Sequence, residues 1–113
     1  MVRHWSEEAA RRYLEGQGYE VLETNYTCRR GEVDLIAREG EVLVFVEVKQ
    51  RKNTLYGTPA DAISAAKIAK LRHTALHYLT ETYERDDLPL RFDAVLLTGT
   101  DKNYRLEHLK AAF

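Results

Sequence analysis

Two strand-like segments joined by a short turn constrain the fold of this chain more than any other feature. They cover residues 31–37 (GEVDLIA) and 42–49 (VLVFVEVK), and Gly40 lies between them. Glycine adopts positive φ without a steric penalty, which the first position of a two-residue hairpin turn often requires. The sequence therefore predicts a tight β-hairpin.

The position of the turn decides which side chains face each other across this hairpin. If residues 40–41 form the turn, Asp34 lies directly opposite Glu47; if residues 39–40 form it, Asp34 faces Phe45 instead. Both registers leave Asp34 and Glu47 on one face, because side chains alternate with a period of two. The opposite face of the second segment is apolar and is predicted to be core: Val42, Val44, Val46 and Val48.

Two acids and a lysine on the shared face allow two interpretations. Carboxylates that face each other across a ladder repel, so positive charge is expected beside Asp34 and Glu47. Lys49, two residues after Glu47, supplies that charge if the cluster is a structural ion network. Alternatively, Asp34 and Glu47 hold a divalent cation, because Mg²⁺ needs only one or two protein carboxylates beside water and phosphate oxygens.

Length and composition favour one globular domain over residues 1–113, with 44% hydrophobic and 31% charged residues. We find neither an apolar stretch near 18 residues nor a leader-like N-terminus, so a cytoplasmic protein without membrane association is expected. The single cysteine, Cys28, cannot form an internal disulfide, which agrees with a reducing compartment.

Affinity for phosphate would need a local basic patch, because the net charge of the whole chain is −1. Residues 51–72 contain five cations and one acid, Asp61. The alternative is an ordinary solvated helix face. Four of the cations are predicted to contact flanking phosphates without reading bases: Arg51, Lys52, Lys67 and Lys70.

The remaining elements predict a mixed sheet. A helix is expected from Ser6, as its N-cap, to Gly16 or Gly18, and a second helix from a start at residues 58–61. A strand reached through a crossover helix usually returns parallel and right-handed. The result is an α/β fold with an αβββαβ core whose central sheet is flanked by helices. Its strands are predicted at residues 19–26, in the hairpin, and at 90–98 and 104–109.

Predictions can also be made for two positions outside the hairpin. Asp93 lies in the middle of a predicted strand beside Arg91, and the two are expected to pair. His108 is interpreted as an ordinary surface or interface histidine.

The hairpin carries a resemblance to a known superfamily. Glu47-Val48-Lys49, with Glu47 thirteen positions after Asp34, resembles the D…(D/E)-x-K signature of the PD-(D/E)xK restriction-endonuclease-like nucleases, whose core is αβββαβ. Similarity to archaeal Holliday-junction resolvases, which share this fold, is more distant. Over nearly its whole length the chain is similar to the YraN-like family of bacterial proteins, through residues 6–10, 13–14, 18–19, 31–37, 44–51, 57, 67, 91–93 and 112–113.

The resemblance implies roles for individual residues. Asp34 and Glu47 would be ligands of Mg²⁺, or of Mn²⁺ in its place, and the carbonyl of Val48 would be a third ligand. Lys49 would position or deprotonate the attacking water. Glu7 would contribute the carboxylate of the N-terminal helix.

The implied function is a Mg²⁺-dependent endonuclease that hydrolyses phosphodiester bonds of DNA, on branched or structured substrates. By analogy with resolvases, which cut two strands symmetrically, a homodimer is implied. The alternative is a catalytically inactive domain, nucleic-acid-binding or adaptor, that keeps the nuclease fold and retains Asp34, Glu47 and Lys49 for structure.

Overall fold

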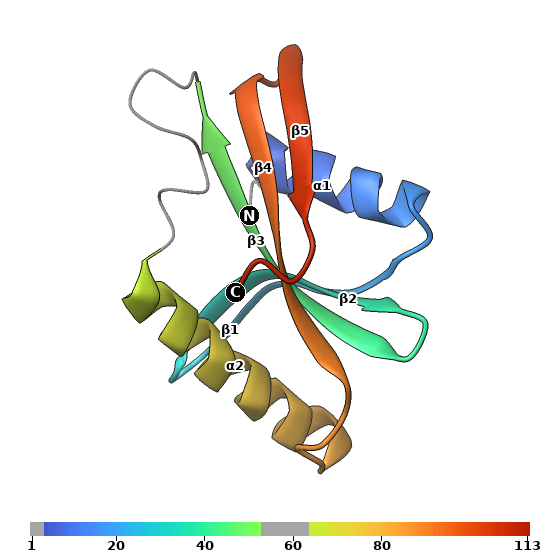
Figure 1. Ribbon diagram of the computed structural model, residues 1–113, viewed down its shortest axis with the longest axis vertical. Coiled ribbons are helices and arrows are strands. Elements are labelled where there is room, and N and C mark those ends of the chain that lie inside the picture. The colour runs from blue at the N-terminus through green and yellow to red at the C-terminus, as the bar shows by residue number, and fades with distance from the viewer. Residues whose placement is uncertain (1–3, 53–63) are drawn as a thin grey trace.

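The computed structural model of the protein describes residues 4–52 and 64–113. The order of elements confirms the predicted αβββαβ core, to which a final strand is added (Figure 1). Along the described residues the elements are α1 (Trp5–Gly16), β1 (Glu20–Cys28), β2 (Gly31–Glu39), β3 (Val42–Arg51), α2 (Ala65–Tyr83), β4 (Leu90–Thr100) and β5 (Asn103–Leu109).

The five strands form one mixed sheet in the order β1-β2-β3-β4-β5. β3 and β4 are parallel and are connected through α2, whereas the other neighbouring pairs are antiparallel. The predicted mixed sheet is therefore confirmed, because the crossover helix returns the chain parallel to β3.

The hairpin of β2 and β3 has the first of the two predicted registers. Arg38 pairs with Leu43, and the turn between the strands is formed by residues 40–41. Gly40 has φ +61, the left-handed conformation that a tight turn with glycine first requires. The ladder ends at the pair Leu35 and Val46, one residue before the two acids.

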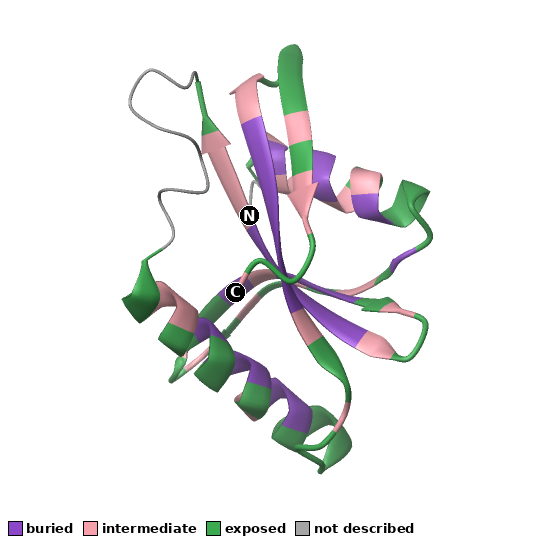
Figure 2. Cartoon of the chain, in the orientation of Figure 1, coloured by how far each residue is buried: buried purple, intermediate pink, exposed green. Residues whose placement is uncertain are grey.

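Each face of the sheet is covered by one helix, and buried residues run along the central strands (Figure 2). α1 packs on the valine face, where Val44 and Val46 are fully buried as predicted. α2 packs on the other face, against Phe45 among others. Glu47 follows Phe45 by two residues, so its side chain lies on the α2 face.

The start of α1 differs from the prediction. His4, not Ser6, is the N-cap: its Nδ1 accepts the backbone N–H of Ser6 at 3.2 Å, and Ser6 is buried within the first turn. The prediction was wrong because serine is a common cap and histidine is a rare one.

α2 begins at Ala65, and its N-cap Ser64 accepts the N–H of Lys67 at 3.2 Å. The predicted start at residues 58–61 lies outside the described residues. α2 comes very close to the beginning of β2, since a Cβ added at Gly31 would lie 3.0 Å from Thr74 Oγ1. Glycine leaves room here for the Thr74 side chain, and its φ of +147 is one that glycine adopts without strain. The start of α2 lies beside the acidic hairpin, where Lys67 contacts Glu47.

Candidate metal centre

The two acids of the hairpin lie where β2 and β3 stop pairing. One residue beyond the last ladder pair, the backbone N–H of Val48 donates to Asp34 Oδ2 at 2.8 Å. A carboxylate thus replaces the backbone carbonyl that would continue the ladder. Within an extended strand the N–H and C=O of one residue point to the same side, so the Val48 carbonyl faces the same gap between the strands.

Glu47 is the more deeply buried acid, with a side chain 2% exposed. Its Oε2 lies 2.9 Å from Lys67 Nζ, which provides a counter-charge. The contact lacks hydrogen-bond geometry, and among the described residues no hydrogen-bond donor meets this buried oxygen. Burying a carboxylate oxygen without a donor is costly, so this atom is the least satisfied polar atom of the site.

The charge of Glu47 makes ionisation of Asp34 more costly. Burial, then the charge of Glu47 and that of Glu7, raise the pKa of Asp34 to about 7, against the opposing effects of the Val48 N–H and Lys67. Glu7 of α1 therefore acts electrostatically on the hairpin. At neutral pH Asp34 is poised between its protonated and ionised forms.

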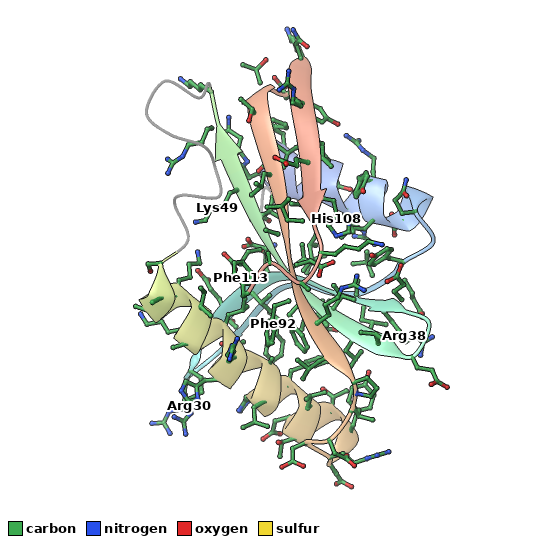
Figure 3. The ribbon with its side chains drawn as sticks, in the orientation of Figure 1. Arg30, Arg38, Lys49, Phe92, His108 and Phe113 are labelled. Atoms are coloured by element: carbon green, nitrogen blue, oxygen red, sulfur yellow. The ribbon has the colours of Figure 1, made fainter. Side chains whose placement is uncertain are left out.

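Two lysines share this pair of acids, and their electrostatic surroundings differ. Burial and the neighbouring ammonium of Lys67 lower the pKa of Lys49, against the opposing charges of Glu47 and Asp34. Burial also works against the charge of Lys67, but its ion pair with Glu47 outweighs burial and raises the pKa. Lys49, which projects from β3 in Figure 3, is therefore the lysine that loses its proton more readily.

These ligands fit a hard divalent cation with few protein donors. Among the described residues no three side chains of histidine, cysteine, aspartate or glutamate are grouped closely enough to hold a metal. Asp34 and Glu47, with the Val48 carbonyl, instead supply two carboxylates and one carbonyl. Mg²⁺ and Mn²⁺ accept such oxygen donors and complete their coordination with water or phosphate oxygens. The orphaned Oε2 of Glu47 is the atom that such a cation would satisfy.

The four cations predicted to contact phosphates lie in two places. Lys67 and Lys70 line a hollow of about 500 Å³ between the β1–β2 turn and the start of α2. Lys52 lines a different hollow, beside the β4–β5 hairpin, and Arg51 is exposed at the end of β3. Only the first hollow is joined to the acidic hairpin, because Lys67 both lines it and pairs with Glu47.

A second buried charge cluster lies on the α1 face of the sheet, where β4 pairs with β5. Asp93 is 0% exposed and accepts Arg91 Nε at 2.8 Å and Arg91 Nη2 at 2.9 Å, which confirms their predicted pairing. His108 Nε2 lies 2.7 Å from Asp93 Oδ2, and the Ala111 N–H donates to Oδ1 at 3.0 Å. Burial alone would raise the pKa of Asp93, but these partners outweigh it and hold the pKa below its ordinary value.

The interpretation of His108 as a surface residue was wrong, since its side chain is 4% exposed. Its Nδ1 lies 3.2 Å from the hydroxyl of Tyr13, and its ring also contacts that of Tyr19. The alternation of the last strand could have indicated burial, because His108 and Leu106 occupy the same face of it. The partner Asp93 lies fifteen residues earlier, so no local pattern indicated the pair.

The mixed five-stranded sheet, flanked by α1 and α2, defines an α/β protein with the core of the restriction-endonuclease-like fold. The chain belongs to the family described as "Uncharacterised protein family UPF0102", whose model matches residues 6–97. This match confirms the resemblance to the YraN-like family.

Similar relatives come from several different bacteria, and the matches cover most of the length of each relative. A UPF0102 protein of Thermus thermophilus is 47% identical over 105 residues, which cover 93% of this chain and 90% of the relative. A UPF0102 protein of Nitrosomonas europaea is 44% identical over 108 residues, covering 96% and 89%. One from Frankia casuarinae is 40% identical over 110 residues, covering 96% and 92%. In the part of the chain that the structure describes, no helix has the length and apolar character needed to span a membrane.

Proposed function

We propose that this protein is a Mg²⁺-dependent endonuclease that hydrolyses phosphodiester bonds in DNA, with its metal centre at Asp34 and Glu47. The observation that carries the proposal is the buried Oε2 of Glu47, which no hydrogen-bond donor of the described residues satisfies. It lies in the same hairpin as Asp34, whose pKa is raised to about 7. An acid with a strongly perturbed pKa beside a second, buried carboxylate is typical of active sites.

The metal ligands would be Asp34, Glu47 and the carbonyl of Val48. Bound there, Mg²⁺ or Mn²⁺ would supply Lewis-acid stabilisation of the phosphate charge and a more acidic water. Asp34 is held in place by the Val48 N–H, and Glu47 by burial, so both carboxylates are oriented before substrate arrives. Preorganised charges of this kind stabilise a transition state without reorganisation.

Lys49 is the proposed general base or water-positioning residue. The lowered pKa of its amine increases the fraction that can accept a proton from the attacking water. Glu7 of α1 adds a third carboxylate charge near Asp34.

The hollow beside the centre supports a polyanionic substrate. Lys67 and Lys70, one helical turn apart, line it together with Thr27, Ser64 and the acid Glu32. Such groups position a phosphate backbone without reading its bases, so selectivity would come from DNA shape. We propose branched or structured DNA as the substrate, cut by a homodimer that presents two centres.

The alternative is an inactive nucleic-acid-binding or adaptor domain, and one observation favours it. Lys67 Nζ already neutralises Glu47 at 2.9 Å, as a structural ion pair would. In that case the acids stabilise the fold, and the cations of α2 hold nucleic acid.

Cleavage assays on a panel of DNA substrates distinguish the two functions. We expect end-labelled linear, flapped or four-way DNA to be cut with Mg²⁺ or Mn²⁺ and left intact with EDTA. Glu47→Gln and Lys49→Met should lower the rate about 100-fold or more. Glu41→Gln, in the exposed turn of the same hairpin, and Lys102→Met, in the β4–β5 turn, are the matched controls and should cut like wild type. Wild type that binds the panel but cuts none of it would leave the inactive domain as the function.

A further inference from the structure

Lys67 reaches Glu47 from the solvent side. It lies in the first turn of α2, and its side chain is 38% exposed, whereas that of Glu47 is 2% exposed. Its ammonium is thus a partly solvated charge beside a buried carboxylate. Lys49, by contrast, belongs to the same strand as Glu47.

We infer that Lys67 is a displaceable counter-ion: its ammonium takes the place of the divalent cation at Glu47 in the metal-free protein and moves into the adjoining hollow when the cation binds. This inference rests on the proposed metal centre. It assigns Lys67 a positioning role toward the metal in addition to a contact with phosphate.

The contact at Glu47 supports displacement rather than a permanent ion pair. A buried carboxylate needs a compensating charge, and Lys67 Nζ supplies it at 2.9 Å from Oε2. A divalent cation would bind the same oxygen, and an ammonium at that distance would then face a like charge. Because the present contact lacks hydrogen-bond geometry, no aligned hydrogen bond is lost when the ammonium leaves.

The hollow provides a destination for the released ammonium. The hollow has a volume of about 500 Å³ and lies between the β1–β2 turn and the start of α2. Lys67 already forms part of its wall. Two lysines, Lys67 and Lys70, and one acid, Glu32, line the hollow, so its lining keeps a net positive charge, which favours a phosphate between the two lysines. Binding of the cation would therefore free a charge for the substrate, so metal and phosphate would each favour the other's binding.

Titration of the protein with Mn²⁺ alone, followed by electron paramagnetic resonance at pH 8, tests the inference. We expect Lys67→Met to lower the Kd for Mn²⁺ about tenfold, since the competing charge is removed. Lys70→Met removes the same charge one turn away and should change the Kd less than about twofold. Lys67→Arg keeps the competitor and should stay near wild type. An unchanged or weaker affinity in Lys67→Met would overturn the inference.

Asp34→Asn separates this inference from the metal centre on which it rests. If Asp34→Asn abolishes Mn²⁺ binding but Lys67→Met leaves it unchanged, the metal centre stands and only the displacement is wrong. If Asp34→Asn binds Mn²⁺ like wild type, or no variant binds at all, the metal centre is wrong as well.

The wild-type protein provides a test that does not depend on how the methionine variant folds. The side-chain ammonium resonances of ¹⁵N-lysine-labelled protein can be assigned to Lys67 by comparison with Lys67→Arg. Saturating Mg²⁺ should move the Lys67 resonance from an ion-paired to a solvent-exchanging position and leave that of Lys102 unchanged. A Lys67 resonance that Mg²⁺ does not alter would also overturn the inference.

Discussion

Asp34 Oδ2 accepts the backbone N–H of Val48 at 2.8 Å, one residue beyond the end of the β2–β3 ladder. The bond keeps the carboxylate between two diverging strands, where water cannot fully solvate it. The same place is shared by the buried Glu47. Two neighbouring, poorly solvated acids therefore destabilise the hairpin. Functional sites often lower the stability of a fold in this way.

That cost should be measurable in the variant Asp34→Asn. The folded pKa of Asp34 is about 7 against an ordinary value of 3.8, so the folded state binds this proton more tightly than the unfolded state. The stability contributed by protonated Asp34 is fully present below pH 3.8 and is lost as the pH rises to about 7. At pH 8 in EDTA, urea unfolding should find Asp34→Asn more stable than wild type, by on the order of 2 kcal/mol.

Asparagine can still accept the Val48 N–H, so the comparison isolates the charge. The difference between variant and wild type should shrink toward pH 4, where both side chains are neutral. A variant less stable than wild type at pH 8 would show that the ionised carboxylate is stabilised by its surroundings.

Glu7 should act on the same titration from α1. Its charge contributes to the raised pKa of Asp34, so Glu7→Gln should lower that pKa below about 7. Carbon-detected NMR of the Asp34 carboxyl across a pH series measures the shift directly. Glu8→Gln, in the same helical turn, is the control and should leave the Asp34 titration in place. An unchanged titration in Glu7→Gln would remove Glu7 from the proposed centre.

The Asp93 cluster should matter for stability and not for metal binding. Asp93→Asn removes a buried charge that accepts from Arg91 and His108, and should cost about 3 kcal/mol in urea unfolding at pH 7. Because the pKa of Asp93 is lowered, its contribution is present above pH 3.8 and is lost as the pH falls through the folded pKa.

Two controls accompany the Asp93 measurement. Asp101→Asn, in the exposed β4–β5 turn, should leave stability unchanged. The Kd for Mn²⁺ should also stay the same in Asp93→Asn, because this cluster lies on the sheet face opposite to Glu47. A large change in Mn²⁺ affinity would mean that Asp93 takes part in the metal centre.

Lys70 should contribute a sequence-independent share of DNA binding. Lys70→Met should weaken binding equally for different sequences and reduce the slope of log K against log salt by about one. Fluorescence anisotropy measured from about 50 to about 200 mM salt provides the slope. Lys102→Met, in the exposed turn between β4 and β5, is the control. A Lys70→Met slope equal to wild type would exclude the hollow as a phosphate site.

The sequence predicted the hairpin well because its determinants are local. A glycine at residue 40 was enough to predict the tight turn, and the structure has one of the two predicted registers. The crossover through α2 likewise follows from the order of elements, which required a parallel return to β3.

What the sequence did not reveal depends on contacts between distant elements. The pairing of Lys67 with Glu47 requires α2 to lie against β2, where Gly31 leaves room for the Thr74 side chain. The burial of His108 requires Asp93 from the neighbouring strand. The cap at His4 replaced a better-known cap residue two positions later. Neither the Lys67–Glu47 pair nor the Asp93–His108 pair can be predicted from a local pattern of residue types.

The position of Mn²⁺ in crystals of the protein tests the proposed metal centre most directly. An anomalous difference map from crystals equilibrated with saturating Mn²⁺ and a short DNA duplex should contain a peak between Asp34 and Glu47, about 2 Å from a carboxylate oxygen of each. Lys67 Nζ should then lie away from Glu47 Oε2. A map in which Mn²⁺ binds elsewhere, or in which Lys67 keeps its contact with Glu47 and no peak lies in the hairpin, would contradict the metal centre.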